Sequence, residues 1–225
     1  MKPKLWIVFG IESLALTALL FGSAGTLRWP AGWAFMALFF GSGLVFSVLL
    51  ARHDPALLDE RLKWVIQKDQ PRWDRVFVSV FLPLMVGWFV LMALDAGRFH
   101  WSAMPAWLQV VGGLALVLSM VIIYRIFREN SFAAAVVRVQ KERGHKVIST
   151  GPYAIVRHPL YATMVVYFPA LPLLLGSWYG LAATPLLLAA LVVRTALEDR
   201  ELRRRLEGYA DYARRVRYRL IPGIW

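Results

Sequence analysis

Long apolar runs constrain this chain more than any other feature of its sequence. Runs at residues 5–24, 31–51, 76–94 and 107–127 each approach the ~20 residues that an α-helix needs to cross a bilayer. Hydrophobic residues make up 59% of the chain, more than a typical soluble domain contains. Because backbone polar groups inside a bilayer must bond to one another, these runs predict an all-α polytopic membrane protein.

Two shorter apolar runs follow, at residues 160–175 and 180–193, joined by a short turn that contains Gly and Ser. Both runs are short for an upright crossing, so we expect a helical hairpin kinked at Pro169 and Pro172. The predicted fold class is therefore an all-α polytopic membrane protein with about six transmembrane segments, which are four spans and this C-terminal hairpin.

Charged segments predict two further helices outside the spans. Near residues 54–70, apolar residues recur at helical spacing beside several cations, which predicts an amphipathic helix lying in the membrane interface. From Arg194 onward the chain is charged and helical, which predicts a cytoplasmic C-terminal helix. We divide the chain into N-terminal spans with the interfacial helix, residues 1–127, and a core with the C-terminal helix, residues 128–225.

Small and polar residues interrupt the first two apolar runs and suggest where helices pack or a carboxylate is buried. Gly41 and Gly43 would let a neighbouring helix approach closely. Glu12 is either a functional intramembrane carboxylate or a group paired inside the bundle. A basic start before an apolar run also fits a cleavable signal peptide, but Glu12 and the lack of an Ala-x-Ala site favour a retained first span.

The distribution of positive charge predicts the orientation in the membrane. Of the 26 Lys and Arg residues, Arg28 and Arg98 lie in other loops. The remaining 24 lie at or near the N-terminus, the connection between the second and third spans, the connection between the fourth span and the hairpin, and the C-terminal tail. With six crossings these segments share one side, so both termini are predicted to be cytoplasmic. The cations lie beside apolar spans, so we expect anionic membrane lipids, and not nucleic acid, to face the net charge of +12.

Residues 145–161 form a dense polar stretch between apolar segments and read HKVISTGPYAIVRHPLY. Gly151-Pro152 marks a turn, and Pro159 after His158 is placed to begin a helix. A polar cradle at the mouth of a helix suits a charged small molecule, although an ordinary basic loop has the same composition.

Arg194 and Glu198 are four residues apart and so share one helix face, where they could form a simple ion pair or meet a ligand. The chain has no Cys, which excludes disulfides, thiolate nucleophiles and Cys-ligated metals. Its four His show no metal-binding spacing, so we expect no metal site.

Together these residues resemble the isoprenylcysteine carboxyl methyltransferase family and its wider group of membrane methyltransferases, which includes phospholipid methyltransferases. The resemblance covers residues 130–225 and rests on the Gly-Pro-Tyr-x-x-x-Arg-His-Pro-x-Tyr pattern of residues 151–161, the Arg194–Glu198 spacing and the RLIPGIW segment at 219–225. It implies S-adenosylmethionine as methyl donor and S-adenosylhomocysteine as product, bound between the polar block and the last helix.

The resemblance also implies roles for individual residues. Arg194 is the implied substrate-binding arginine and Glu198 the implied cofactor-binding carboxylate, and these two are the catalytic candidates. Asp199 stands where the family has a second glutamate, a shortening that weakens the phospholipid interpretation. The other implied cofactor contacts are Gln140, His145, Lys146, Val147, Ile148, Tyr153, His158, Pro159, Leu160 and Tyr161.

Methyl transfer from a sulfonium is an in-line displacement that needs alignment more than acid–base catalysis. Because Arg194 suits an anionic nucleophile, we expect a membrane methyltransferase that uses S-adenosylmethionine to O-methylate a carboxylate on a lipophilic or small acceptor. The open alternatives are phospholipid N-methylation, small-thiol S-methylation, an NADPH-dependent membrane reductase and a non-catalytic lipid-binding scaffold. No marker of a eukaryotic source is present, so we expect a prokaryotic plasma membrane; the oligomeric state stays undetermined.

Overall fold

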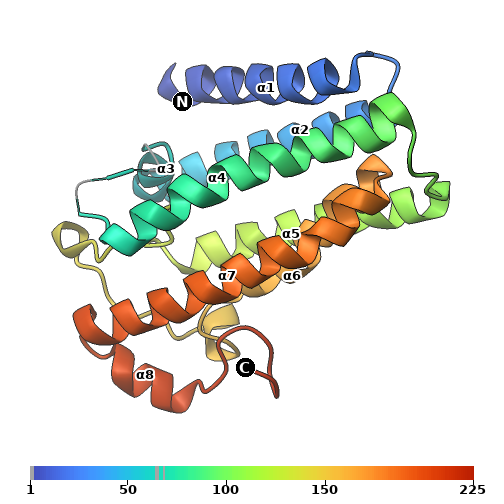
Figure 1. The fold of residues 1–225 in the computed structure, drawn as a ribbon. Helices are drawn as coiled ribbons and strands as arrows, with labels where there is room; N and C mark the ends of the chain where they lie inside the picture. Colours follow the sequence, from blue (N-terminus) through green and yellow to red (C-terminus); the bar gives the residue numbers. More distant parts are fainter. Residues whose placement is uncertain (1–2, 64–65, 68) are drawn as a thin grey trace.

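The computed structural model describes residues 3–63, 66–67 and 69–225, which form helices and loops without a β-strand (Figure 1). The all-α fold class is thereby confirmed. The long helices are α1 (Pro3–Ala24), α2 (Pro30–His53), α4 (Arg72–Met92), α5 (Ala106–Glu129), α6 (Pro159–Leu175) and α7 (Trp178–Arg205). The short elements are α3 (Pro55–Arg61), the π-helix η1 (Ala93–Phe99), the 3₁₀-helices η2 (Lys141–Arg143) and η3 (Gly151–Ala154), and α8 (Tyr209–Arg215).

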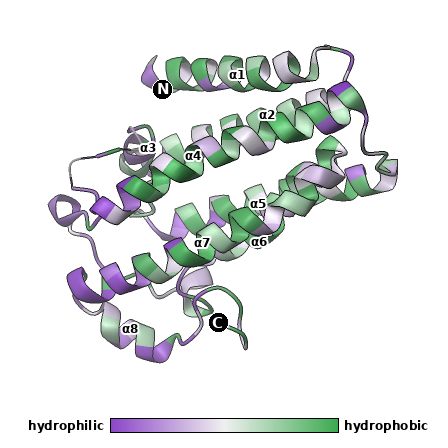
Figure 2. Ribbon diagram, viewed as in Figure 1, coloured by the Kyte–Doolittle hydropathy of each residue, from purple (hydrophilic) through white to green (hydrophobic). Residues whose placement is uncertain are grey.

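Within the described residues, 5 helices are long and apolar enough to cross a membrane: α1, α2, α4 with η1, α5 and α7. Figure 2 shows apolar residues along these helices and polar residues concentrated near α3, α8 and the adjoining end of α7. The chain is therefore an integral membrane protein. Helix α6 has 17 residues, short of the ~20 needed to cross upright, so six crossings stay a prediction.

The long helices alternate in direction and bring several connections to one end of the bundle (Figure 1). The N-terminal end of α1, the α2-to-α4 connection, the α5-to-α6 connection and α8 all lie at this end. These are the segments in which the Lys and Arg residues concentrate, so the predicted grouping of basic segments agrees with the fold. Which side of the membrane this end faces stays a prediction.

The apolar core runs through the middle of the bundle and draws on all six long helices of the described residues. Leu20, Phe35, Met92, Leu116 and Leu171 have no exposed surface, and they come from α1, α2, α4, α5 and α6 respectively. Lipid is as apolar as these side chains, so close fit rather than water exclusion must hold the helices together.

Glycines permit the closest helix contacts, but not the glycines that the sequence pattern singled out. A Cβ on Gly112 of α5 would collide with the backbone nitrogen of Leu174 in α6, and a Cβ on Gly180 of α7 would collide with Met92. Gly41 and Gly43 have nothing within 4 Å of their Cβ positions. The expectation of close packing at Gly41 and Gly43 is therefore wrong, because that part of α2 faces outward.

Helix α7 is longer than the apolar run that predicted it. Its start is capped by the Ser177 hydroxyl, which accepts a hydrogen bond from the Gly180 amide at 2.9 Å. The helix then continues for 28 residues to Arg205, well past the end of the apolar run at residue 193, because Leu, Ala, Glu and Arg are strong helix formers. Arg194 and Glu198 thus lie within one continuous helix, and the hairpin with α6 is confirmed.

The amphipathic helix predicted near residues 54–70 is shorter in the structure. Helix α3 covers only Pro55–Arg61, with Asp54 accepting a hydrogen bond from the Leu57 amide at 2.9 Å. Leu57 and Leu58 are buried in a cluster with Leu5 and Leu50, so this apolar face contacts other helices of the chain. Trp64, Val65 and Lys68, which belong to the predicted helix, lie outside the described residues.

Glu12 lies on an exposed face of α1. Among the described residues, no hydrogen bond or ion pair within the chain holds its side chain, so pairing inside the bundle, one of the two expectations, is not seen. Its role stays open.

Candidate active site

A pocket opens where the loop after α5 meets η3, the start of α6, the end of α7 and α8. Its free space is about 810 Å³ when the part open to solvent is included. It collects all but one of the predicted cofactor residues together with the predicted substrate residue. These are His145, Lys146, Val147, Ile148, Tyr153, His158, Pro159, Leu160, Tyr161, Glu198 and Arg194.

Local chain geometry explains how residues 151–161 reach this pocket. Gly151 has a φ of 55°, in the left-handed region, and Pro152 follows it into the short helix η3. Pro159 is the first residue of α6 and His158 is its N-cap. The predicted turn and the predicted helix start are both confirmed, and together they bring the polar side chains to the end of the bundle.

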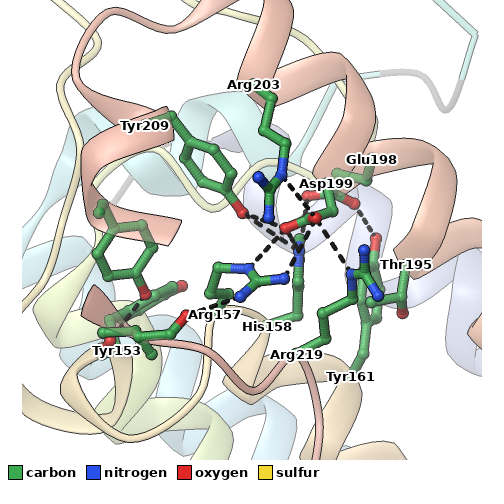
Figure 3. Close-up of polar contacts among 12 residues, drawn as sticks. Tyr153, Arg157, His158, Tyr161, Thr195, Glu198, Asp199, Arg203, Tyr209 and Arg219 are labelled. Atoms are coloured by element: carbon green, nitrogen blue, oxygen red, sulfur yellow. Dashed lines mark hydrogen bonds and ion pairs between the residues drawn. The ribbon is translucent and has the colours of Figure 1, made fainter. Parts of the chain in front are cut away.

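The buried carboxylate of Asp199 on α7 holds the site together (Figure 3). Arg157 approaches it with two nitrogens, Nε at 2.7 Å from Oδ1 and Nη2 at 3.3 Å from Oδ2. The Nη1 atom of Arg157 also donates to the carbonyls of Val216 and Arg217, both at 2.7 Å. Arg157 therefore ties α7 to the segment that follows α8.

Three more side chains donate to Asp199. The Tyr209 hydroxyl donates to Oδ1 at 3.0 Å, and the Nε atoms of Arg203 and Arg219 each donate to Oδ2 at 3.1 Å (Figure 3). Asp199 was considered above only as a shortened family carboxylate. Both oxygens of Asp199 already accept hydrogen bonds from these groups. The presence of Asp instead of the longer Glu at this position therefore says little about which methyl acceptor the site binds.

The segment after α8 also bonds directly to the backbone of the motif. The Arg157 amide donates to the Tyr218 carbonyl and the His158 amide to the Arg219 carbonyl, both at 3.0 Å. These bonds and the contacts of Arg157 fix the loop before α6 from both backbone and side chain.

His158 is buried beside two carboxylates of α7, those of Glu198 and Asp199. Its Nε2 lies 3.4 Å from Asp199 Oδ1 and 3.3 Å from the Tyr209 hydroxyl, and its Nδ1 lies 4.0 Å from Glu198 Oε1. Its ring is nearly parallel to that of Tyr161, with an interplanar angle of 18°. Asp199 and Tyr209 thus orient the imidazole, and its other nitrogen faces Glu198.

Glu198 keeps one oxygen available to a ligand in the pocket. The Tyr161 hydroxyl donates to its Oε2 at 2.5 Å, whereas its Oε1 lies 4.0 Å from His158 Nδ1 (Figure 3). A carboxylate oxygen in this position can accept a hydrogen bond from a hydroxyl or an ammonium group.

Arg194 pairs with Asp74 of α4 and not with Glu198. Its Nη2 lies 3.1 Å from Asp74 Oδ1 and donates to the Ala135 carbonyl at 3.2 Å. Its guanidinium also lies over two aromatic rings, at 5.0 Å from the centre of Phe77 and 5.8 Å from that of Tyr161. The simple i,i+4 pair that the spacing allowed is replaced by a contact between distant parts of the chain.

His145 lines the pocket through packing and one backbone bond. Its ring stacks on Phe132 with centroids 4.5 Å apart, and its Nδ1 accepts from the Gln140 amide at 3.2 Å. Burial, with the nearby positive charge of Arg143, lowers the pKa of His145 to about 4. The imidazole is therefore neutral at pH 7.

Gln140, the remaining predicted cofactor contact, is not among the residues that line the pocket. Its side chain is fully buried, its Nε2 donates to the Phe132 carbonyl at 2.8 Å, and its Oε1 accepts from Arg143. Gln140 therefore shapes the loop on which His145 lies.

Aromatic hydroxyls complete the wall beneath the pocket. The Tyr153 hydroxyl accepts from Asn130 Nδ2 at 2.8 Å, and the Tyr153 carbonyl accepts from the Tyr212 hydroxyl at 2.7 Å. Burial raises the pKa values of Tyr153 and Tyr209 well above their usual range, and that of Tyr212 to about 12. All three phenols therefore stay neutral and act as hydrogen-bonding groups.

Several residues of this site were not singled out by their local sequence. Asp74, Arg157, Tyr209 and Tyr212 hold or line the pocket, yet the sequence presents Tyr209 and Tyr212 simply as part of a basic surface helix. The Arg-His-Pro pattern was a signal for Arg157. No local signal marks Asp74, because its partners lie far away in the chain.

Comparison with known proteins places these residues in a family. The phospholipid methyltransferase family model matches residues 107–207, from the start of α5 to just beyond the end of α7. The match begins before the predicted core boundary at residue 128 and includes His145, Glu198 and Arg194. The chain matches no curated protein at a significant level. Residues 107–207 thus form a phospholipid methyltransferase family domain, of the membrane methyltransferase kind.

Proposed function

We propose that this protein is an integral membrane methyltransferase that uses S-adenosylmethionine to methylate a lipophilic or small acceptor. The observation that carries the proposal is the pocket itself. It gathers Glu198, Arg194 and the side chains of the 145–161 stretch at one end of a bundle of apolar helices, within a methyltransferase family domain. A site at the end of such a bundle is accessible to a water-soluble donor and a membrane-borne acceptor.

The groups present suit S-adenosylmethionine, which supplies a sulfonium-activated methyl group when bound. Glu198 offers one oxygen for a hydroxyl or the ammonium of the donor. Tyr153 and Tyr161 place aromatic rings along the pocket, and such rings attract a cationic centre. The neutral His145 adds no positive charge that would repel it. We propose the cofactor contacts that the resemblance implies, Gln140 excepted, as direct contacts with the donor, and Gln140 as support for the loop.

The residues of the chain contribute mainly alignment. Asp199 and Tyr209 orient His158, Tyr161 orients Glu198, and these buried contacts keep the wall in one arrangement before any ligand binds. A displacement reaction gains most from such positioning of the two reacting groups. We assign Arg194 to the acceptor and Glu198 to the donor.

For the acceptor, we propose a carboxylate that is O-methylated while its charge faces Arg194. A lipid amine is the second candidate, favoured by the family match and by the Asp74 carboxylate that offsets the charge of Arg194. We also propose that the pocket end faces the cytoplasm of a prokaryotic cell, and that anionic lipids contact its basic segments. Both follow from the distribution of Lys and Arg.

Titration calorimetry with S-adenosylhomocysteine tests the donor assignment. We expect the purified protein to bind it, and Glu198→Gln to weaken binding about tenfold or more, because a hydrogen bond to a charged group is lost. Glu207→Gln is the matched control, since Glu207 is exposed, makes the same charge change and does not line the pocket. Binding of NADPH but not of S-adenosylhomocysteine would support the reductase alternative and contradict the proposal.

Labelled methyl donor tests the acceptor assignment. Dodecanoate and dodecylamine are matched probes, with one chain length and opposite headgroup charges. We expect Arg194→Gln to abolish methylation of dodecanoate while S-adenosylhomocysteine still binds. Methylation of dodecylamine alone would favour the amine candidate, and loss of donor binding in Arg194→Gln would contradict the division of roles.

A further inference from the structure

Asp74 is a fully buried carboxylate in the first turn of α4, outside the segment that the family model matches. From the N-terminal half of the chain it contacts Arg194, which lines the pocket. A buried charge of this kind is costly unless it is paired, so its partners indicate what it is for.

Each oxygen of Asp74 has a separate task. Oδ2 accepts from Gln70 Nε2 at 2.8 Å and from the Val137 amide at 2.9 Å. Oδ1 forms an ion pair with Arg194, whose Nη2 atom is 3.1 Å away, and it accepts no hydrogen bond from any described residue. Gln70 and Val137 therefore fix the carboxylate, and the fixed carboxylate faces Arg194.

Helix α4 contacts Arg194 a second time, one turn further on. Phe77 is three residues after Asp74 and so lies on the same helix face, with its ring 5.0 Å from the guanidinium carbon. The Ala135 carbonyl accepts from the same Nη2 atom at 3.2 Å. These contacts hold one side of the guanidinium, whereas its buried Nε has no hydrogen-bond partner in the described part of the chain.

We propose that Asp74 is a positioning residue that holds Arg194 in its acceptor-facing conformation. An arginine side chain has many conformations, and fixing it before the acceptor arrives avoids that entropic cost during binding. Arg194, which lines the pocket, is thus held by a helix outside the family domain. This inference rests on the proposed function only where it calls Arg194 the acceptor residue.

Arginine modification tests the positioning without needing the acceptor. The full-length protein, its Asp74→Asn variant and its Asp74→Glu variant are treated with phenylglyoxal, and the modified sites are mapped by mass spectrometry. In Asp74→Asn we expect Arg194 to react about tenfold faster, because a broken buried pair makes local opening easier. Arg157 is the internal control, since its partner Asp199 is untouched and its reaction rate should not change.

Kinetics with dodecanoate and labelled methyl donor then separate positioning from general stability. We expect Asp74→Glu, which keeps the charge but moves it, to raise the KM for dodecanoate about tenfold with S-adenosylhomocysteine affinity unchanged. Asp211→Asn is the control for loss of an exposed carboxylate, because its pair with Arg214 lies on the surface of α8. If Asp74→Asn does not fold, Asp74→Glu supplies both measurements.

The inference is overturned if Arg194 reacts at the wild-type rate in both variants. It is also overturned if Arg157 accelerates equally, since Asp74 would then support the fold as a whole. If the wild-type protein fails to bind S-adenosylhomocysteine, the proposed function fails, and the modification rates still decide whether Asp74 positions Arg194.

Discussion

Replacing Asp199 by Asn removes the charge on which five side chains converge without changing the size of the residue. Arg157, 4% exposed, would keep its charge in a buried place without a counter-ion. Breaking a buried ion pair from one side costs about 3–5 kcal/mol. Arg203 and Arg219 have side chains 41% and 29% exposed, so their contacts add at most about 1 kcal/mol each. The Tyr209 hydroxyl can still donate to the amide oxygen.

Thermal unfolding in detergent measures this cost. For a chain of this length we expect Asp199→Asn to lower the melting temperature by roughly 6–20 °C. We also expect weaker S-adenosylhomocysteine binding, because the loop that carries His158 loses its anchor. Asp211→Asn, whose exposed pair lies on α8, should leave both quantities unchanged. A melting temperature equal to that of the wild type would refute the idea that Asp199 holds the site together.

Two further predictions concern pH and helix packing. The pKa of His145 is about 4 in the folded chain and ~6.5 in an unfolded one, so below pH 6.5 the unfolded chain binds a proton that the folded chain does not. Stability should therefore fall as the pH falls from 6.5 toward 4, and His145→Gln should flatten the decline in a pH series of thermal melts; parallel curves would contradict this. Gly112→Ala should lower the free energy of unfolding by about 1–3 kcal/mol, because its Cβ would collide with the backbone of Leu174. Gly113→Ala, whose Cβ would meet its nearest neighbours at 3.5 Å, should be neutral or stabilising in the same melts, and equal effects of the two changes would argue against the close contact of α5 and α6.

The helices were predictable from the sequence because their signals are local. Each long apolar run became a helix within a few residues of its predicted bounds, since a bilayer leaves the backbone few alternatives. Prediction from the sequence failed where tertiary contacts determine the length of a helix or the face that it buries. Helix α3 ends at Arg61 and buries Leu57 against other helices, and the outward-facing Gly41 makes no close contact. Periodicity and residue size cannot show which face meets a partner.

The site shows the same division between local and distant information. The turn at Gly151 and the helix start at Pro159 were readable from their own residue types, and they place most of the predicted residues in the pocket. The contacts of Asp74 with Arg194 and of Arg157 with Asp199 join segments far apart in the chain. A single sequence carries no signal for such pairings, because a motif can mark Arg157 without showing which carboxylate it meets.

The backbone bonds between the motif before α6 and residues 218–219 have a consequence for biosynthesis. The ribosome makes those residues after all six long helices of the bundle, so Arg157 and His158 are made before the carbonyls that accept from their amides. The pocket can close only when that last segment folds back across it. Donor binding would therefore begin after the helices are inserted, and a nascent chain still leaving the ribosome would have no complete site to occupy.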